Sequence, residues 1–362
     1  MTEESNSSNN IPSAAAAFQR QSSHKKRLIL GLAALALVLA VIAINAGAAE
    51  THPGQVLRTL LGLESGLSNV VIWNIRLPRI IAGIVAGGGL AAAGCVMQTC
   101  LRNPLASPFT LGISNAAAFG ANLAIVFFNA GTMYSSTQDA VFINNPYRVS
   151  LSAFLFALIS MILILYLARL RGFSPESVVL AGVAFGSLFG AGSTLVQYFA
   201  EDVQVAAMVF WTFGDLGRVS WHEVMILSIL TFLALVYFLL HRWNYNTLES
   251  GEDTARGLGV NVDRVRFQSM LTASLVTAAA VSFMGIIGFI GLIAPQMMRR
   301  VMGIDHRFLL PASAVTGAVL LLFADTLART LISPIVLPVG AITSFFGAPL
   351  FIFILAKGYN RR

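Results

Sequence analysis

The feature that most constrains this chain is a series of apolar runs long enough to cross a lipid bilayer. The first run, residues 28–48, contains no charged residue. At about 1.5 Å of helical rise per residue it is roughly 31 Å long, which matches the hydrocarbon core of a membrane. A cleaved signal peptide is the alternative, but its apolar core would hold only about 7–15 residues. We therefore expect a retained first membrane span.

Further apolar segments follow, each bounded by charge, proline or glycine. They lie at approximately residues 80–98, 110–130, 149–168, 177–199, 222–241, 267–286, 287–300, 309–328 and 337–356. The composition agrees, because only 11% of the residues are charged, whereas soluble domains carry about 25%. The sequence predicts an all-α membrane protein of about ten transmembrane helices. Near residue 287, Gly285, Gly288 and Gly291 interrupt the apolar stretch and indicate a short or broken helix.

The positions of the basic residues test this count, because Lys and Arg stay on the cytoplasmic side of short loops. If the N-terminus is inside, ten spans also return the C-terminus to the inside. The inner set is then Arg20, Lys25, Lys26, Arg27, Arg102, Arg169, Arg171, Arg242, Arg256, Arg264, Arg266, Arg299, Arg300, Arg307, Lys357, Arg361 and Arg362. The outer set is only Arg58, Arg76, Arg79, Arg148, Arg218 and Arg329. We expect a multi-pass protein of the cytoplasmic (inner) membrane with both termini cytoplasmic.

The sequence divides into one transmembrane domain and two tails. Residues 1–27 are rich in Ser, Asn, Gln and Ala and lack the apolar content to bury themselves, so we expect a disordered cytoplasmic tail. The transmembrane domain covers 28–358, and 359–362 form a short cytoplasmic tail. The two cysteines, Cys95 and Cys100, lie in one apolar run. We expect them to be packing residues, with neither a disulfide framework nor a metal site.

The sequence lacks the motifs of several catalytic classes. A P-loop needs Gly-Lys-[Ser/Thr], and none of the three lysines stands in that setting. The histidines lie at span edges or in tails, none at metal-ligand spacing, and we expect them at the surface or the interface; they are His24, His52, His222, His241 and His306. Asp325 is the one carboxylate that falls deep within a span, and Arg329 follows one turn later to neutralise it. The chain can form a pathway, but we find no catalytic residues and no means of driving transport.

Several motifs follow one another in a recognisable order. They are Trp73-Asn-Ile-Arg76-Leu-Pro78-Arg79, Arg102-Asn103-Pro104-Leu105-Ala106, Gly257-Leu258-Gly259-Val260, Gly288 through Pro295, Asp305-His306-Arg307, Ala324 through Arg329, and Leu337-Pro338-Val339-Gly340. In these motifs the chain resembles, over roughly residues 28–358, the FecCD-type permease subunits of iron–siderophore, haem and cobalamin ABC importers. The resemblance implies a bundle like that of the cobalamin importer permease. It also implies ATP-driven import of a ferric siderophore, with haem or cobalamin as alternatives. An ion-coupled secondary transporter and an intramembrane enzyme are the competing classes.

The resemblance also implies partners. Two ABC ATPase subunits would bind ATP and Mg²⁺, so this chain would bind no cofactor itself. A second permease copy or paralogue would complete the pathway within the membrane lipid, and an extracytoplasmic substrate-binding protein would deliver the substrate. Nothing in the resemblance implies nucleic acid.

Residues 242–266 form the longest polar insert on the inner side, and their composition predicts a short helix. Ser250 and Asp253 have capping-box-like spacing, Glu252 and Arg256 are four apart, and Gly257 or Gly259 can end the helix. A solvated loop is the alternative. In the importers that the chain resembles, this loop docks into a groove on the ATPase. The matching residues are Glu252, Asp253, Arg256, Gly257, Leu258, Gly259 and Val260.

Three further sets of residues are candidates. Pro104 and Pro108 stop helices and predict a rigid inner turn that supplies a second partner contact from Arg102, Asn103 and Pro104. In the importers that the chain resembles, outer arginines at the positions of Arg76, Arg79 and Arg329 bind acidic residues of the binding protein. Anchoring at the membrane interface is the alternative for all three. Arg329 has a further alternative, an ion pair with Asp325. A mildly polar conduit, or alternatively helix-to-helix hydrogen bonds, is predicted for Ser193, Thr194, Gln197, Thr343 and Ser344.

Glycines four residues apart predict close helix packing. Gly83 with Gly87, and Gly186 with Gly190, each place a notch of small residues on one helical face. Another backbone can approach closely at such a notch.

Overall fold

The computed structural model describes residues 14–47, 53–63, 66–127, 131–133, 141–143, 145–170, 172 and 174–359. Its elements, in chain order, are α1 (Ala14–Asn45), α2 (Pro53–Leu60), α3 (Leu67–Val70), the π-helix η1 (Val71–Arg76), α4 (Leu77–Cys100), α5 (Ile113–Phe127), β1 (Gly131–Met133), β2 (Val141–Ile143), α6 (Pro146–Leu170), α7 (Pro175–Tyr198), α8 (Asp202–Thr212), the 3₁₀ helix η2 (Leu216–Arg218), α9 (Trp221–Leu240), α10 (Arg242–Glu249), α11 (Glu252–Gly257), α12 (Val262–Met284), α13 (Ile290–Met302), α14 (His306–Thr330) and α15 (Val339–Tyr359).

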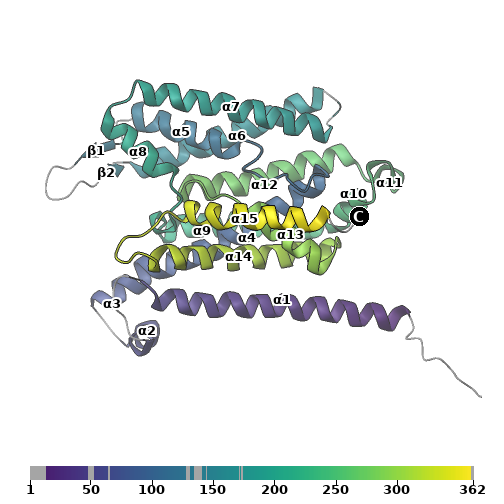
Figure 1. Ribbon diagram of the computed structural model, residues 1–362, viewed down its shortest axis with the longest axis horizontal. Coiled ribbons are helices and arrows are strands. Elements are labelled where there is room, and N and C mark those ends of the chain that lie inside the picture. Colours follow the sequence, from purple (N-terminus) through teal and green to yellow (C-terminus); the bar gives the residue numbers. More distant parts are fainter. Residues whose placement is uncertain are drawn as a thin grey trace, which may run out of the picture.

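The long helices lie side by side and form an elongated bundle (Figure 1). Among the described residues, seven helices are long and apolar enough to cross a membrane: Gln19–Asn45, Ser68–Cys100, Pro146–Leu170, Pro175–Tyr198, Trp221–Leu240, Val262–Met284 and His306–Thr330. Two shorter apolar helices, Ile113–Phe127 and Val339–Ile354, accompany them. The predicted fold class, a helical membrane bundle, is confirmed. Each of the ten predicted spans corresponds to one helix, namely α1, α4, α5, α6, α7, α9, α12, α13, α14 and α15.

The predicted broken helix near residue 287 is confirmed. Helix α12 ends at Met284, Gly285 and Phe289 have positive φ angles of 77° and 65°, and α13 then runs for only 13 residues. Non-helical backbone is tolerated at membrane depth only where protein or a cavity surrounds it. Here the segment before α9 pairs with it: Phe213 forms a parallel β-bridge with Ile286, and the Asp215 amide donates to the Met284 carbonyl over 2.8 Å.

The prediction of a disordered tail over residues 1–27 is wrong for its described part. Helix α1 already begins at Ala14, because Ala, Gln, Lys and Arg are strong helix formers and the membrane span continues the same helix. Near this end the Lys25 ammonium lies 5.3 Å from the centroid of the Phe308 ring. Residues 1–13 and, of the predicted tail 359–362, residues 360–362 lie outside the described residues.

Helix α4 is the centre of the bundle and packs against α9, α12, α13 and α14. Its glycines permit this: a Cβ on Gly87 would lie 2.4 Å from the Gly317 carbonyl oxygen, and one on Gly94 only 1.8 Å from the Gly291 carbonyl oxygen. The close backbone approach predicted for the Gly83–Gly87 notch is therefore confirmed at Gly87, whereas at Gly83 the side chains of Leu216 and Leu322 approach. On α7, Gly186 packs on Gly112, but Gly190 has no described atom within 4 Å of such a Cβ, so its predicted role in close packing is wrong.

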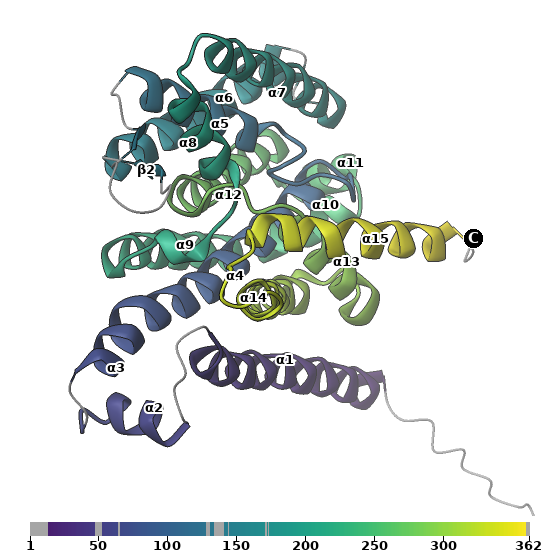
Figure 2. The same ribbon diagram turned by 60° about the vertical axis from the view of Figure 1, so that its left-hand side comes forward.

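The bundle has two distinct ends, which Figures 1 and 2 show. The α11 end carries α10, α11 and the C-terminal part of α15. The opposite α2 end carries α2, α3, α8 and the antiparallel β1–β2 pair. Helix α1 lies at the edge of the molecule, against α14. The short elements α2, α8 and β1–β2 were not predicted, because none of them has the length or the hydropathy of a membrane span.

Candidate functional site

At the α11 end, α10 and α11 form a compact helical hairpin. The N-cap of α11 is Gly251, with φ 119°, and not Ser250, so the predicted capping box of Ser250 and Asp253 is wrong. The reason is that α10 runs to Glu249, which leaves Ser250 as its C-cap. The predicted stop is confirmed, since Gly259 has φ 82° and donates to the Arg256 carbonyl over 3.0 Å. Val260 donates to the Ala255 carbonyl over 3.0 Å, which completes a Schellman motif.

The charged residues of this hairpin pair differently from the prediction. Arg256 pairs with Asp263 over 3.3 Å, and Glu252 pairs with Arg266 of α12, so the predicted Glu252–Arg256 pair is wrong. In each pair the partners come from the α11 hairpin and from α12, because α12 packs against α11. The remaining surface forms an exposed tip, with Leu258 67% exposed. The tip consists of Asp253, Thr254, Arg256, Gly257, Leu258 and Gly259, while Glu252 and Val260 are half-buried.

Behind the tip, two arginines connect the hairpin to the carboxyl end of α4. Arg266 is buried, and its Nε donates to the Cys100 carbonyl over 2.9 Å. Arg299 on α13 donates through Nη1 to Glu249 Oε1 over 2.6 Å and through Nη2 to Thr99 Oγ1 over 2.8 Å. None of these contacts was predicted from the sequence.

His306 lies next to this network and is completely buried, so the prediction of a surface or interfacial residue is wrong for it. Its Nε2 is 2.9 Å from Thr99 Oγ1, and its Nδ1 is 3.1 Å from Asn246 Oδ1. The burial follows from its place at the start of α14, against which α10 packs. The prediction does hold for His24 and His222, which are exposed, and His52 lies outside the described residues.

The turn between α4 and α5 is held by one hydrogen bond of its own and one from α13, in agreement with the predicted rigid turn. Asn103 Oδ1 accepts from the Leu105 amide over 2.9 Å, and Gln296 Nε2 donates to the Pro104 carbonyl over 2.8 Å. Arg102 adopts a φ of 44° and is exposed, as is Pro104. These residues lie at the α11 end, and their partner contact remains a prediction.

At the α2 end, the three predicted docking arginines are buried: Arg76, Arg79 and Arg329 are 4%, 7% and 7% exposed. Exposed docking charges are not found, because the Arg76 side chain reaches the Ile44 carbonyl of α1 and the Arg79 side chain reaches Asp325 of α14. Arg79 Nε donates to Asp325 Oδ1 over 2.8 Å. The Asp325–Arg329 pair that the sequence indicated is confirmed, at 3.0 Å.

The same arginines also bind the last carbonyl groups of α1. Arg76 donates to the Ile44 carbonyl over 2.6 Å, and Arg329 donates to the carbonyls of Ala46 and Ala43 over 2.6 and 3.1 Å. A helix leaves its last four carbonyl groups without helical partners, and cations near that end are favourable. The arginines therefore attach α1 to the centre of the bundle.

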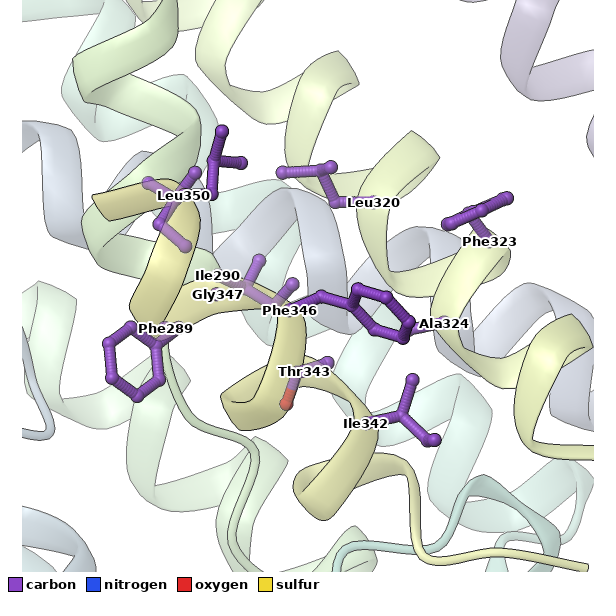
Figure 3. A pocket seen from close by; sticks show the side chains of 11 residues that line it. Phe289, Ile290, Leu320, Phe323, Ala324, Ile342, Thr343, Phe346, Gly347 and Leu350 are labelled. Atoms are coloured by element: carbon purple, nitrogen blue, oxygen red, sulfur yellow. The ribbon is translucent and has the colours of Figure 1, made fainter. Parts of the chain in front are cut away.

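A mostly apolar crevice of about 170 Å³ lies between α13, α14 and α15 (Figure 3). Side chains of α14 and α15 face one another across it, and Thr343 is the one lining residue with a polar side chain. The Thr343 hydroxyl donates to the Gly340 carbonyl over 3.0 Å within α15. Such a surface suits an acyl chain or an apolar side chain better than a polar ligand.

The other predicted pathway residues lie elsewhere. Thr194 is exposed and donates to the Gly190 carbonyl within α7, while Ser193 and Gln197 are half-buried on the same helix. Ser344 faces Gly288 in the helix break. Helix α7 packs on α5, α6 and α8, whereas α15 packs on α13 and α14. The two halves of the predicted lining are therefore not brought together in this chain.

Comparison with known proteins decides the class. The model of the FecCD transport family matches residues 35–357. The chain belongs to the FecCD transport family.

Relatives of this FecCD protein are similar over nearly their whole length. A Methanocaldococcus jannaschii protein, named as an ABC transporter permease with no stated substrate, is 54% identical over 93% of this chain and 97% of its own. The Fe(3+)-citrate import system permease of Bacillus subtilis is 39% identical over 90% of this chain and 94% of its own. Haemin and vitamin B12 permeases also match.

A solved structure agrees with the helical arrangement. It is described as an inward-facing, metal-chelate type ABC transporter, and it matches with a TM-score of 0.76 and 29% identity over 92% of this chain and 99% of that chain. The FecCD protein is therefore an ABC importer permease. This family membership decides against the two competing hypotheses from the sequence, a secondary transporter and an intramembrane enzyme.

Sequence reasoning missed the residues behind the tip of this FecCD permease: Thr99, Asn246, Glu249, Arg266 and Arg299. Each is a polar or charged residue in or beside a predicted inner loop, and from the sequence alone such residues are expected on the solvent-exposed surface. The available signal was the tight clustering of Arg264, Arg266, Arg299 and Arg300 near span ends, and it indicated orientation rather than contacts.

Proposed function

We propose that this permease is the membrane-spanning subunit of an ATP-driven importer that carries a ferric siderophore across the cytoplasmic membrane. The names of the Fe(3+)-citrate relative and of the metal-chelate type structure support an iron chelate. Haem or cobalamin is the alternative, which the haemin and vitamin B12 relatives keep open. The excess of Lys and Arg supports placing the α11 end and both termini on the cytoplasmic side.

The observation that carries this proposal is the exposed apolar Leu258 on a fixed turn, with the hairpin held from behind by the buried Arg266. A protruding apolar side chain on a fixed turn is suited to a groove on another protein. We assign ATPase docking to Glu252, Asp253, Arg256, Gly257, Leu258, Gly259 and Val260. Arg102, Asn103 and Pro104 form the second contact. Two ATPase subunits bind ATP and Mg²⁺, since the sequence has no P-loop.

The pathway requires a second permease copy or paralogue. In one chain α7 and α15 are apart, yet both expose large apolar residues, such as Leu188 and Leu195 on α7 and Phe345 and Phe353 on α15. In a two-fold symmetric pair a patch of one copy can meet a different patch of the other. The conduit residues Ser193, Thr194 and Gln197 would then face Thr343 and Ser344 across the pair.

The binding protein would dock at the α2 end. Arg76, Arg79 and Arg329 lie together there, and Arg79 and Arg329 pair with Asp215 and Asp325. A cluster of arginines attracts acidic residues of a partner and speeds association, in a salt-dependent way. Docking of this kind depends on the electrostatic field of the arginine cluster and does not require its ion pairs with Asp215 and Asp325 to break.

The test is coexpression of this chain with ATPase and binding-protein subunits from its own locus, followed by reconstitution into liposomes. We expect ATP-dependent uptake of an iron-labelled siderophore that the loaded binding protein stimulates. Haem and cobalamin are offered in parallel to identify the substrate class. Uptake that follows a proton or sodium gradient without any ATPase would overturn the proposal.

A further inference from the structure

We propose that Arg299 and Arg266 are positioning residues that transmit movement of the α10–α11 hairpin to the carboxyl end of α4. This inference rests on the proposed function, in which the hairpin docks on an ATPase. It goes further by naming the residues through which that contact reaches the transmembrane bundle.

Arg299 joins three helices at one point. It lies on α13, and its two terminal nitrogens separately reach Glu249 on α10, at 2.6 Å, and Thr99 on α4, at 2.8 Å. The Arg299 and Glu249 side chains are only 17% and 20% exposed. A planar guanidinium with donors in a fixed fork holds two acceptors in a defined relation, which a lysine does not do. Movement of Glu249 therefore displaces Thr99.

Arg266 repeats this arrangement one helical turn away along the hairpin. Its Nη2 donates to Glu252 at the start of α11, and its Nε donates to the Cys100 carbonyl at the end of α4. The Arg266 side chain is buried. Two consecutive residues of α4, Thr99 and Cys100, thus each receive an arginine that also holds a glutamate of the hairpin.

The hydrogen bonds around Thr99 determine the orientation of Asn246 and the tautomer of His306 beside the Arg299 contact. Asn246 Nδ2 donates to Asp305 Oδ1 over 3.1 Å, which orients Asn246 Oδ1 as the acceptor toward His306 Nδ1. With its proton on Nδ1, His306 presents Nε2 toward the Thr99 hydroxyl, 2.9 Å away. The Thr99 hydroxyl accepts from Arg299 and lies within donating distance, 3.0 Å, of Glu249 Oε1, so it links α4 to α10, α13 and α14 at once.

Helix α4 can carry a displacement to the other end of the bundle. It is buried along most of its length, and its backbone touches α13 at Gly94 and Gly291 and α14 at Gly87 and Gly317. At its far end Arg79 is paired with Asp325. A closely packed helix moves as a unit, because interiors of this density do not absorb small shifts. The contacts of Arg266 and Arg299 with α4 therefore connect the ATPase side to the face where the binding protein docks.

The experiment uses the reconstituted complex of permease, ATPase and binding protein, and measures substrate taken up per ATP hydrolysed. We expect Arg299→Gln and Glu249→Gln each to lower this ratio at least fivefold while ATP hydrolysis continues. Arg299→Lys, which keeps the charge but not the fork, should give an intermediate ratio. Arg264→Gln is the matched control, because Arg264 is an exposed arginine at the same end of α12.

Thr99→Val keeps the test usable if an Arg299 variant does not fold, since it removes only the hydroxyl on α4. It should lower the ratio as well, and combining it with Glu249→Gln should lower it no further, because both act on one connection. An unchanged ratio in folded, assembled Arg299→Gln and Thr99→Val complexes would overturn the inference. Failure of the wild-type permease to associate with any ATPase would instead overturn the proposed function.

Discussion

The Arg79 guanidinium on α4 donates to the Asp325 carboxylate on α14 over 2.8 Å, although the two residues lie 246 positions apart in the sequence. Arg329 approaches the other oxygen of the same carboxylate at 3.0 Å. A single buried acid thus holds two buried arginines, which in turn hold α1 and the loop before α9. This explains why a carboxylate within a span need not carry protons.

Replacing Asp325 with Asn tests that explanation. The substitution keeps the shape but leaves Arg79 and Arg329 without their common counter-charge, which in a buried setting costs about 3–5 kcal/mol. We expect a clear fall in the thermal unfolding temperature in detergent, and no dependence of uptake on a proton gradient in either the wild type or the variant. A variant of normal stability that loses gradient-driven uptake would show a proton-relay site instead.

Gly94→Ala should destabilise the bundle. The added Cβ would stand 1.8 Å from the Gly291 carbonyl oxygen, so α4 and α13 would have to separate. Overpacking of this kind costs about 1–3 kcal/mol, or more where backbone must move. Gly31→Ala on α1 is the matched control, because no described atom lies within 4 Å of its Cβ, and it should stabilise slightly through helix propensity. Thermal unfolding of the two variants in detergent decides, and equal unfolding temperatures would contradict the packing argument.

Leu258→Asp should separate docking from folding. Leu258 is 67% exposed, so its loss should leave the unfolding temperature within a degree or two of the wild type, as is usual for surface changes. A charge placed in an apolar groove should weaken binding to the ATPase subunit about tenfold or more. Pull-down and titration with the ATPase measure this, with Arg264→Gln as control. Unchanged binding would place the ATPase contact elsewhere.

The ion pair of Asp305 and Arg307 predicts an acid-dependent loss of stability. Burial opposes the charge on Asp305, but hydrogen bonds from Arg307 and Asn246 outweigh it and hold its pKa at about 2, below the ordinary 3.8. A depressed acid pKa contributes stability above the ordinary value, and this contribution disappears as the pH falls toward the folded-state pKa. Between about pH 4 and pH 2, unfolding in detergent should therefore be steeper for the wild type than for Asp305→Asn. Parallel curves would contradict the assignment.

Much of the fold follows from local properties of the chain. Each predicted span has its helix because apolar length is a property of consecutive residues, and the break near 287 follows from glycines that accept positive φ angles. The end of α11 at Gly259 was predictable for the same reason. The start of α1 at Ala14 was missed, because a polar composition does not prevent a helix from continuing out of a membrane span.

The contacts of the charged groups could not be predicted in this way. Glu252 and Arg256 are correctly spaced for a helical pair, yet Glu252 binds Arg266 and Arg256 binds Asp263. His306 reads as an interfacial residue and is buried, because α10 folds over the start of α14.

By itself the sequence determined that the chain is a helical membrane protein, where its spans lie, which loops are basic and where two of its helices stop. These depend on hydropathy and backbone geometry within a few residues. The tertiary structure alone decided that the outer arginines are buried around Asp325, that Arg266 and Arg299 connect the hairpin to α4, and that α7 and α15 lie apart. An ion pair forms between whichever groups packing brings within a few ångströms, and here packing joins residues up to hundreds of positions apart.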